Sequence, residues 1–200
     1  MSLFKTGLRP FRRYLGDERA SITVEMVMVF PILLWGYFGM FILFDAYRAL
    51  SSNIRASYTI SDMLSREVNE VNAAYIEGLN DIQDVLTQSP ERTVLRVTFV
   101  SYDAASETHT LEGSYSTEGK DPIAAGNFQT AIVDNLPPMP DTGWLIVVET
   151  WVAYIPFMNI TLEQLYQMGE KSDRYVFGPF FFESLVSVRP RFAGQMTLNF

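Results

Sequence analysis

DERASITVEMVMVFPILLWGYFGMFILF, residues 17–44, is the stretch that decides the fold. Its part from Met26 to Phe44 holds nineteen consecutive residues without Asp, Glu, Lys, Arg or His. That length is close to the ~20 residues that a helix needs to cross the ~30 Å hydrocarbon layer of a membrane. Glu25 stands directly before this run, and a carboxylate costs roughly 2.5–3.5 kcal/mol at the centre of a bilayer and less near its surface. Glu25 is therefore either an interfacial charge or the partner of a positive group.

Three interpretations of residues 22–44 compete. A cleaved secretory signal peptide has a shorter apolar region that ends at a small-x-small site, whereas this run ends next to Asp45 and Arg48. The pair Arg12-Arg13 suggests a twin-arginine export signal, but acidic residues follow it and the match stops at the pair. A buried core helix would need a large domain around a helix that is apolar on all sides. A single membrane span fits the stretch best.

The charges are distributed unevenly along the chain. Residues 1–20 carry five basic and two acidic side chains, and the remaining residues carry 10 basic and 21 acidic ones, within a whole-chain net charge of −8. Basic residues before an apolar span predict a cytoplasmic N-terminus, with the rest of the chain on the other side of the membrane. The acidic body argues against nucleic-acid binding, which requires clustered Lys and Arg to contact phosphates.

The chain lacks the residue types of the common catalytic and metal sites. Its 200 residues include no cysteine and one histidine, His109, which excludes disulfides and thiol nucleophiles and leaves too few ligands or bases for zinc motifs or triads. His109 lies in a polar stretch and is predicted to be a solvated surface residue. Glu149 and Asp173 are carboxylates that an anchored hydrolase could use, but such residues are more often simply solvated. We expect no enzyme activity, no cofactor and no metal.

Pro31, Gly36 and Gly39 give the apolar run an unusual composition. Pro31 is predicted to kink or loosen the helix. Gly36 and Gly39 lie three residues apart and would let another helix approach closely, although Gly and Pro are also simply common in membrane helices.

After Phe44 the apolar residues follow a helical period, and polar residues lie on the opposite face. The stripe consists of Ala46, Leu50, Ile54, Tyr58, Ser61, Leu64, Val68, Val71, Tyr75, Leu79, Ile82 and Leu86. Gly78 is a candidate interruption, and Ser89-Pro90 ends the pattern. The span and this stretch are therefore predicted to form one long helix.

From residue 93 the period changes to that of strands. Strands are expected at 93–103, 107–117, 143–157 and 180–194, the first two as a hairpin, and short helical segments at 127–135 and 161–169. The predicted fold is α+β: a long N-terminal helix, membrane-spanning in its first half and amphipathic in its second, packed on an antiparallel sheet of about four strands. The expected order is a basic cytoplasmic leader (1–20), a transmembrane helix (21–44), an amphipathic helical stem (45–88) and an extracytoplasmic β-rich domain (89–200).

The start of the apolar run resembles the type IV pilin superfamily, and more narrowly the TadE/TadF-like minor pseudopilins of the Flp (tight adherence) pilus system. The residues that carry the likeness are Arg19-Ala20-Ser21-Ile22-Thr23-Val24-Glu25, followed by MVMVFPILLW. In that family a prepilin peptidase cuts after a short basic leader that ends in a small residue, usually glycine, and glutamate is fifth in the mature chain. The resemblance implies cleavage between Ala20 and Ser21 and a role in assembly for Glu25. It covers residues 17–67, and the β-rich remainder only in outline.

A cut after Ala20 would create an α-amine one helical turn from Glu25. Such an amine has an unperturbed pKa of ~7.7–8.0 and is largely protonated at neutral pH. Glu25 would then neutralise the amine of its own chain or of a neighbour. Major Flp pilins are far shorter and typically have tyrosine where this chain has Met26, so the likeness favours a minor subunit.

The leading prediction is a non-catalytic minor pseudopilin that takes part in pilus assembly. Its implied partners are other pilins or pseudopilins, the prepilin peptidase and the lipid of the bacterial inner membrane, with the C-terminal domain in the periplasm or in an extracellular pilus. The alternative is a single-pass, membrane-anchored extracytoplasmic module that binds or senses a ligand.

Overall fold

The computed structural model of the 200-residue chain describes residues 18–136, 139, 142–157, 160–161, 175–177, 180–192 and 196–200. The chain divides into two compact units, with the boundary between Asp45 and Ala46. One helix, α2 (Glu18–Arg66), contributes to both units and continues through Pro31 without a break. The residue-31 amide has no N–H to donate, yet the chain on either side keeps the helical hydrogen-bond pattern.

The first part of α2 is almost entirely exposed. Among the described residues, α2 is the one helix long and apolar enough to cross a membrane. The predicted apolar span therefore lies in a helix of the required length, and its described side chains are at least partly exposed apart from Ile42.

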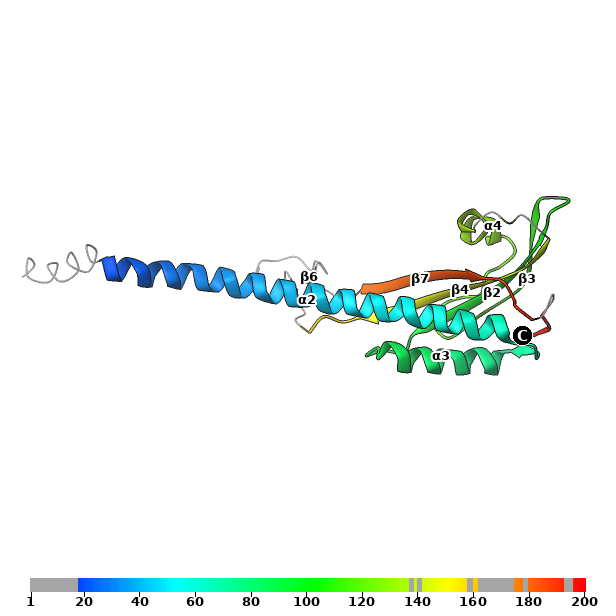
Figure 1. Ribbon diagram of the computed structural model, residues 1–200, viewed down its shortest axis with the longest axis horizontal. Helices are drawn as coiled ribbons and strands as arrows, with labels where there is room; N and C mark the ends of the chain where they lie inside the picture. The colour runs from blue at the N-terminus through cyan, green and yellow to red at the C-terminus, as the bar shows by residue number, and fades with distance from the viewer. Residues whose placement is uncertain are drawn as a thin grey trace, which may run out of the picture. The chain divides into compact units, whose positions relative to one another are not determined.

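The second unit is built on a four-stranded antiparallel sheet (Figure 1). Its order is β3-β2-β4-β7, so β2 and β4 are central and β3 and β7 lie at the edges. The bounds are β2 Val94–Asp103, β3 Thr108–Ser116, β4 Gly143–Tyr154 and β7 Phe180–Val188. The predicted hairpin and the two later strands are confirmed, although the last strand ends at Val188, where Arg189 and Pro190 follow.

The second half of α2 packs on one face of this sheet together with α3 (Ala73–Thr87), as Figure 1 shows. Because strand side chains alternate between faces, this face takes every second residue of the central strands. The core between the layers consists of Ile60, Leu64, Val71, Ile76, Leu79, Leu95, Val97, Phe99, Ile146, Val148 and Met196. The α+β fold, with the long N-terminal helix on a four-stranded antiparallel sheet, is thus confirmed.

The other face of the sheet carries a smaller core. Helix α4 (Phe128–Ala131) and the single 3₁₀ turn η1 (Val133–Asn135) cover it, in the place of the predicted helix at 127–135. The buried residues there are Val100, Phe128, Ile132, Met139, Leu145 and Val147.

The helical stem is not one helix. Helix α2 ends at Arg66, and residues 67–70 turn the chain before β1 (Val71–Asn72) and α3. The Glu67 carboxylate accepts hydrogen bonds from the backbone N–H groups of Val68 and Asn69, and the Asn72 side chain caps α3 by accepting from the Tyr75 N–H. These local hydrogen bonds favour a turn over a continuing helix. The break therefore comes before Gly78, which lies inside α3.

Short strands close the second unit. β1 pairs in parallel with β8 (Leu198–Asn199), in the register Val71 with Leu198, so the C-terminal residues lie beside the turn that joins the two helices. β5 (Ile160–Thr161) pairs with β6 (Tyr175–Phe177). Beyond Thr161, the predicted helical segment 161–169 lies outside the described residues.

The predicted apolar stripe of the stem is only partly right in α2 after the span: Ser61 and Leu64 are buried as expected, but other positions differ. Ile54 and Tyr58 are exposed, whereas Asn53, Ser57 and Ser65 are fully buried. Small polar side chains let the helix approach the sheet closely and hydrogen-bond to it, and a pattern of apolar residues alone cannot reveal this.

Candidate functional site

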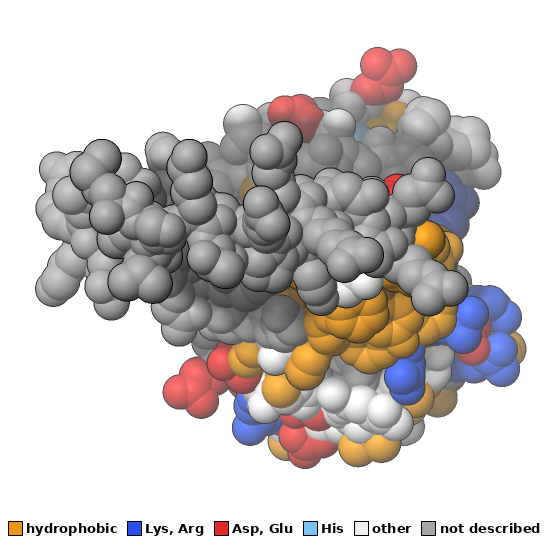
Figure 2. Space-filling view, turned by 90° about the vertical axis from the view of Figure 1, so that its left-hand side faces the viewer, with side chains coloured by type: hydrophobic (Ala, Val, Ile, Leu, Met, Phe, Trp, Pro, Cys, Tyr) orange, Lys and Arg blue, Asp and Glu red, His pale blue; other side chains and the backbone are white. Residues whose placement is uncertain are grey.

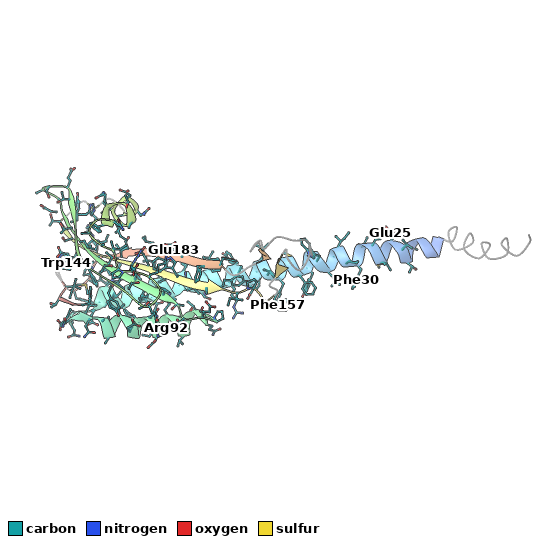
Figure 3. All side chains as sticks on the ribbon, turned by 180° about the vertical axis from the view of Figure 1, so that it is seen from behind. Glu25, Phe30, Arg92, Trp144, Phe157 and Glu183 are labelled. Carbon is teal, nitrogen blue, oxygen red and sulfur yellow. The ribbon has the colours of Figure 1, made fainter. Side chains whose placement is uncertain are left out.

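The predicted processing and assembly residues all lie on α2. Ala20 and Ser21 belong to its first described turn, and Glu25 follows one turn later. Positions four apart lie on the same side of a helix, so Glu25 and residue 21 share a face. Among the described residues Glu25 is exposed and makes no hydrogen bond or ion pair. Its carboxylate is available to a group from outside the described part of the chain (Figure 3).

A continuous apolar surface follows Glu25. Large side chains from Ile22 to Tyr37 are 39–71% exposed, including Phe30 and Trp35. In the view of Figure 2, hydrophobic side chains form one patch on the face that is presented. Exposed apolar surface of this extent indicates a contact with a membrane or a protein, because exposing it to water is unfavourable.

Pro31, Gly36 and Gly39 are also placed on this exposed helix. A Cβ added at Gly36 or Gly39 would meet no atom within 4 Å. Nothing in the described part of the chain therefore requires glycine at either position. A close approach by a second helix would supply such a reason.

The second unit contains a buried polar link that the sequence did not reveal. The Ser57 and Thr150 hydroxyls are 2.8 Å apart, and the Thr150 hydroxyl donates to the Asn53 side-chain oxygen at 3.1 Å. All three residues are fully buried. Their hydrogen bonds join α2 to β4 at one defined register, because a shift of the helix would leave buried polar atoms unpaired.

Glu149 is held in an ion pair with Arg96. Its two carboxylate oxygens accept from Arg96 Nε and Nη2 at 2.7 Å each, and both side chains are largely buried. The Arg96 guanidinium also lies over the Trp151 ring, 4.9 Å from its centroid, and the Lys120 amine lies 4.5 Å from the same ring. These side-chain contacts connect β2, β4 and the loop that contains Lys120. Asp173, the other carboxylate considered for hydrolysis, lies outside the described residues.

His109 differs from the prediction of a solvated residue. It is half-buried, its ring lies 4.7 Å from that of Tyr102 between centroids, and its Nε2 is buried without a hydrogen-bond partner in the described structure. Its surroundings are those of a packed side chain. In the described part of the chain, no group of three or more His, Asp or Glu side chains is arranged to hold a metal ion.

Comparison of the chain with protein-family models, with curated proteins and with solved structures found no match in any of the three.

Proposed function

We propose that the chain is a non-catalytic minor pseudopilin that takes part in the assembly of a Flp (tight adherence) type IV pilus. One observation carries the proposal: Glu25 lies one helical turn after Ser21, at the start of the apolar run of α2, whose side chains are largely exposed. The likeness of residues 19–25 to processed pilin N-termini supports the same reading.

The chemistry of the pair explains why a carboxylate stands at this place. After cleavage by a prepilin peptidase between Ala20 and Ser21, the new α-amine is largely protonated at neutral pH, given its ordinary pKa of ~7.7–8.0. Placing an unpaired carboxylate in a membrane costs free energy. This cost is much smaller when the carboxylate is paired with an amine. Pairing with the amine of a neighbouring subunit therefore favours assembled helices over separate ones.

The topology follows from the charges on either side of the span. The basic residues before Ser21 keep the N-terminus in the cytoplasm, α2 crosses the bacterial inner membrane, and the second unit lies in the periplasm. Other pilins or pseudopilins then cover the exposed apolar side chains when the subunit enters a pilus.

The test is the N-terminal sequence of the protein recovered from cells with and without the prepilin peptidase. Mass spectrometry should find Ser21 as the first residue in the first strain and the uncut leader in the second. A chain that keeps its leader in both strains contradicts the proposal and favours the single-pass anchored binding module.

A further inference from the structure

An open pocket of about 440 Å³, called the Trp144–Glu112 cavity below, lies where β4 begins, on the face of the sheet that carries the larger core. Figure 3 labels Trp144, which lines it. Ligand pockets typically measure ~300–1,000 Å³. The described residues that line it are Glu112, Trp144, Met196, Thr197 and Leu198. They come from β3, β4 and the segment that leads into β8.

The strand register places Ser101 and Glu112 close to Trp144. Ser101 lies opposite Trp144 in the β2–β4 ladder, and the Ser101 hydroxyl donates to Glu112 Oε1 at 2.5 Å. Glu112 is the extra residue of a β-bulge, because Gly113 pairs with Phe99 while Leu111 pairs with Val100. Bulges redirect a side chain relative to a regular strand, and here the bulge residue is the carboxylate that lines the cavity.

The wall opposite the sheet is held in place. The Thr197 carbonyl accepts a hydrogen bond from the Val71 N–H at 2.9 Å, Met196 is buried in the larger core, and Leu198 pairs with Val71. A wall that is held in this way needs little reorganisation when a ligand enters, which reduces the cost of binding.

The two tryptophans of the second unit differ in what lies against them. Trp151 is already covered by Arg96 and Lys120. Trp144 is half-buried beside a carboxylate, and no Lys or Arg of the described residues lies over its ring or pairs with Glu112. An aromatic ring attracts a cation to its face, and a carboxylate forms charge-assisted hydrogen bonds with N–H donors.

We propose that the Trp144–Glu112 cavity binds an organic cation, an alkylammonium or guanidinium group, from a small amine or from a Lys or Arg side chain of a protein partner. The acidity of the second unit supports this, since residues 46–200 carry 10 basic and 19 acidic side chains and a negative surface concentrates cations near it. This site is separate from Glu25 and does not depend on the pseudopilin proposal.

The test titrates the full chain in detergent with choline, with N-acetyl-lysine-methylamide and with N-acetyl-arginine-methylamide, and follows the Trp144 indole N–H by NMR. The uncharged isostere 3,3-dimethylbutan-1-ol is the matched control ligand. We expect saturable shifts with at least one cation and none with the alcohol. Preference for choline indicates a small-amine site, and preference for an amino-acid derivative indicates a protein partner.

Two variants locate the site. Glu112→Gln keeps the shape and the hydrogen bond from Ser101 but removes the charge, and should weaken cation binding by about tenfold or more. Glu107→Gln in the same hairpin is the control and should bind like the unmodified chain. Equal binding of the alcohol and the cations, no shift with any probe, or unchanged cation binding by a folded Glu112→Gln variant would each overturn the proposal.

Discussion

At the scale of single residues, the two most informative carboxylates have opposite surroundings. Glu149 is buried and bonded through both oxygens to Arg96, whereas Glu25 is exposed and has no partner among the described residues. A buried, fully paired carboxylate has a structural explanation within the chain. An unpaired carboxylate at the edge of an apolar span has no such explanation within the described residues, and the proposed pairing with an N-terminal amine would supply one.

Replacing Glu25 should therefore affect assembly and leave folding unchanged. We expect Glu25→Ala and Glu25→Gln to insert into membranes normally but to be recovered with partner pilins several-fold less than the unmodified chain, since the charge is what pairs with the amine. Pull-down from solubilised membranes measures this, with Glu91→Gln as the exposed control. Undiminished recovery of both Glu25 variants would contradict the assigned role.

Replacing Glu149 should affect stability. Glu149→Ala leaves the Arg96 guanidinium largely buried without its counter-charge, which typically costs about 3–5 kcal/mol. The double variant Arg96→Met, Glu149→Leu removes both charges and should recover most of that loss. Denaturant unfolding of the three proteins measures the difference, and a Glu149→Ala variant as stable as the unmodified chain would show that the pair is unimportant.

At the scale of elements, the sheet could be predicted from the sequence and the stem could not. Residues 94–103 and 143–154 are rich in β-branched and aromatic side chains, and such a composition is a local property that needs no tertiary information. The buried face of α2 depends instead on hydrogen bonds from Asn53 and Ser57 to Thr150, which is far from both in the sequence. The cavity at Trp144 was missed for the same reason: its walls come from three separate segments.

The polar link between α2 and β4 can be tested directly. Thr150→Val keeps the shape of the side chain but leaves the Ser57 hydroxyl and the Asn53 amide oxygen each with one partner fewer, which should cost about 1–3 kcal/mol. Thr59→Val, in the same helix but exposed, is the control and should change stability by less than about 0.5 kcal/mol. Thermal unfolding of both variants measures the effect, and equal losses would refute the special role of the link.

The turn between α2 and α3 should respond to alkaline pH. Burial and a hydrogen bond with Glu67 raise the pKa of Tyr75 to about 12, above the ordinary value near 10. The folded state therefore favours the protonated phenol. Its contribution to stability is complete below pH 10 and is lost as pH rises from 10 towards 12. Tyr75→Phe should lose less stability over that range, as measured by denaturant unfolding at several pH values, and identical pH profiles would contradict this.

At the scale of the whole molecule, the two units differ in where their apolar side chains lie. Every residue of both buried clusters lies after residue 59, whereas the exposed apolar side chains are concentrated between Ile22 and Phe44. Residues 46–200 should therefore fold and stay soluble without the preceding part, and the full chain should need detergent. Near-UV circular dichroism and sedimentation measure this, and aggregation of the 46–200 fragment would show that the first unit is needed for folding.

The pairing of β1 with β8 has a consequence for the order of events during synthesis. Val71 leaves the ribosome long before its partner Leu198, and Met196, part of the same core, is made just before that partner. Contacts between distant parts of a chain form late because a long loop must close first. The larger core is thus completed only after residues 196–198 have been made, and until then the segments that precede them lack part of the packing that holds them in the folded state.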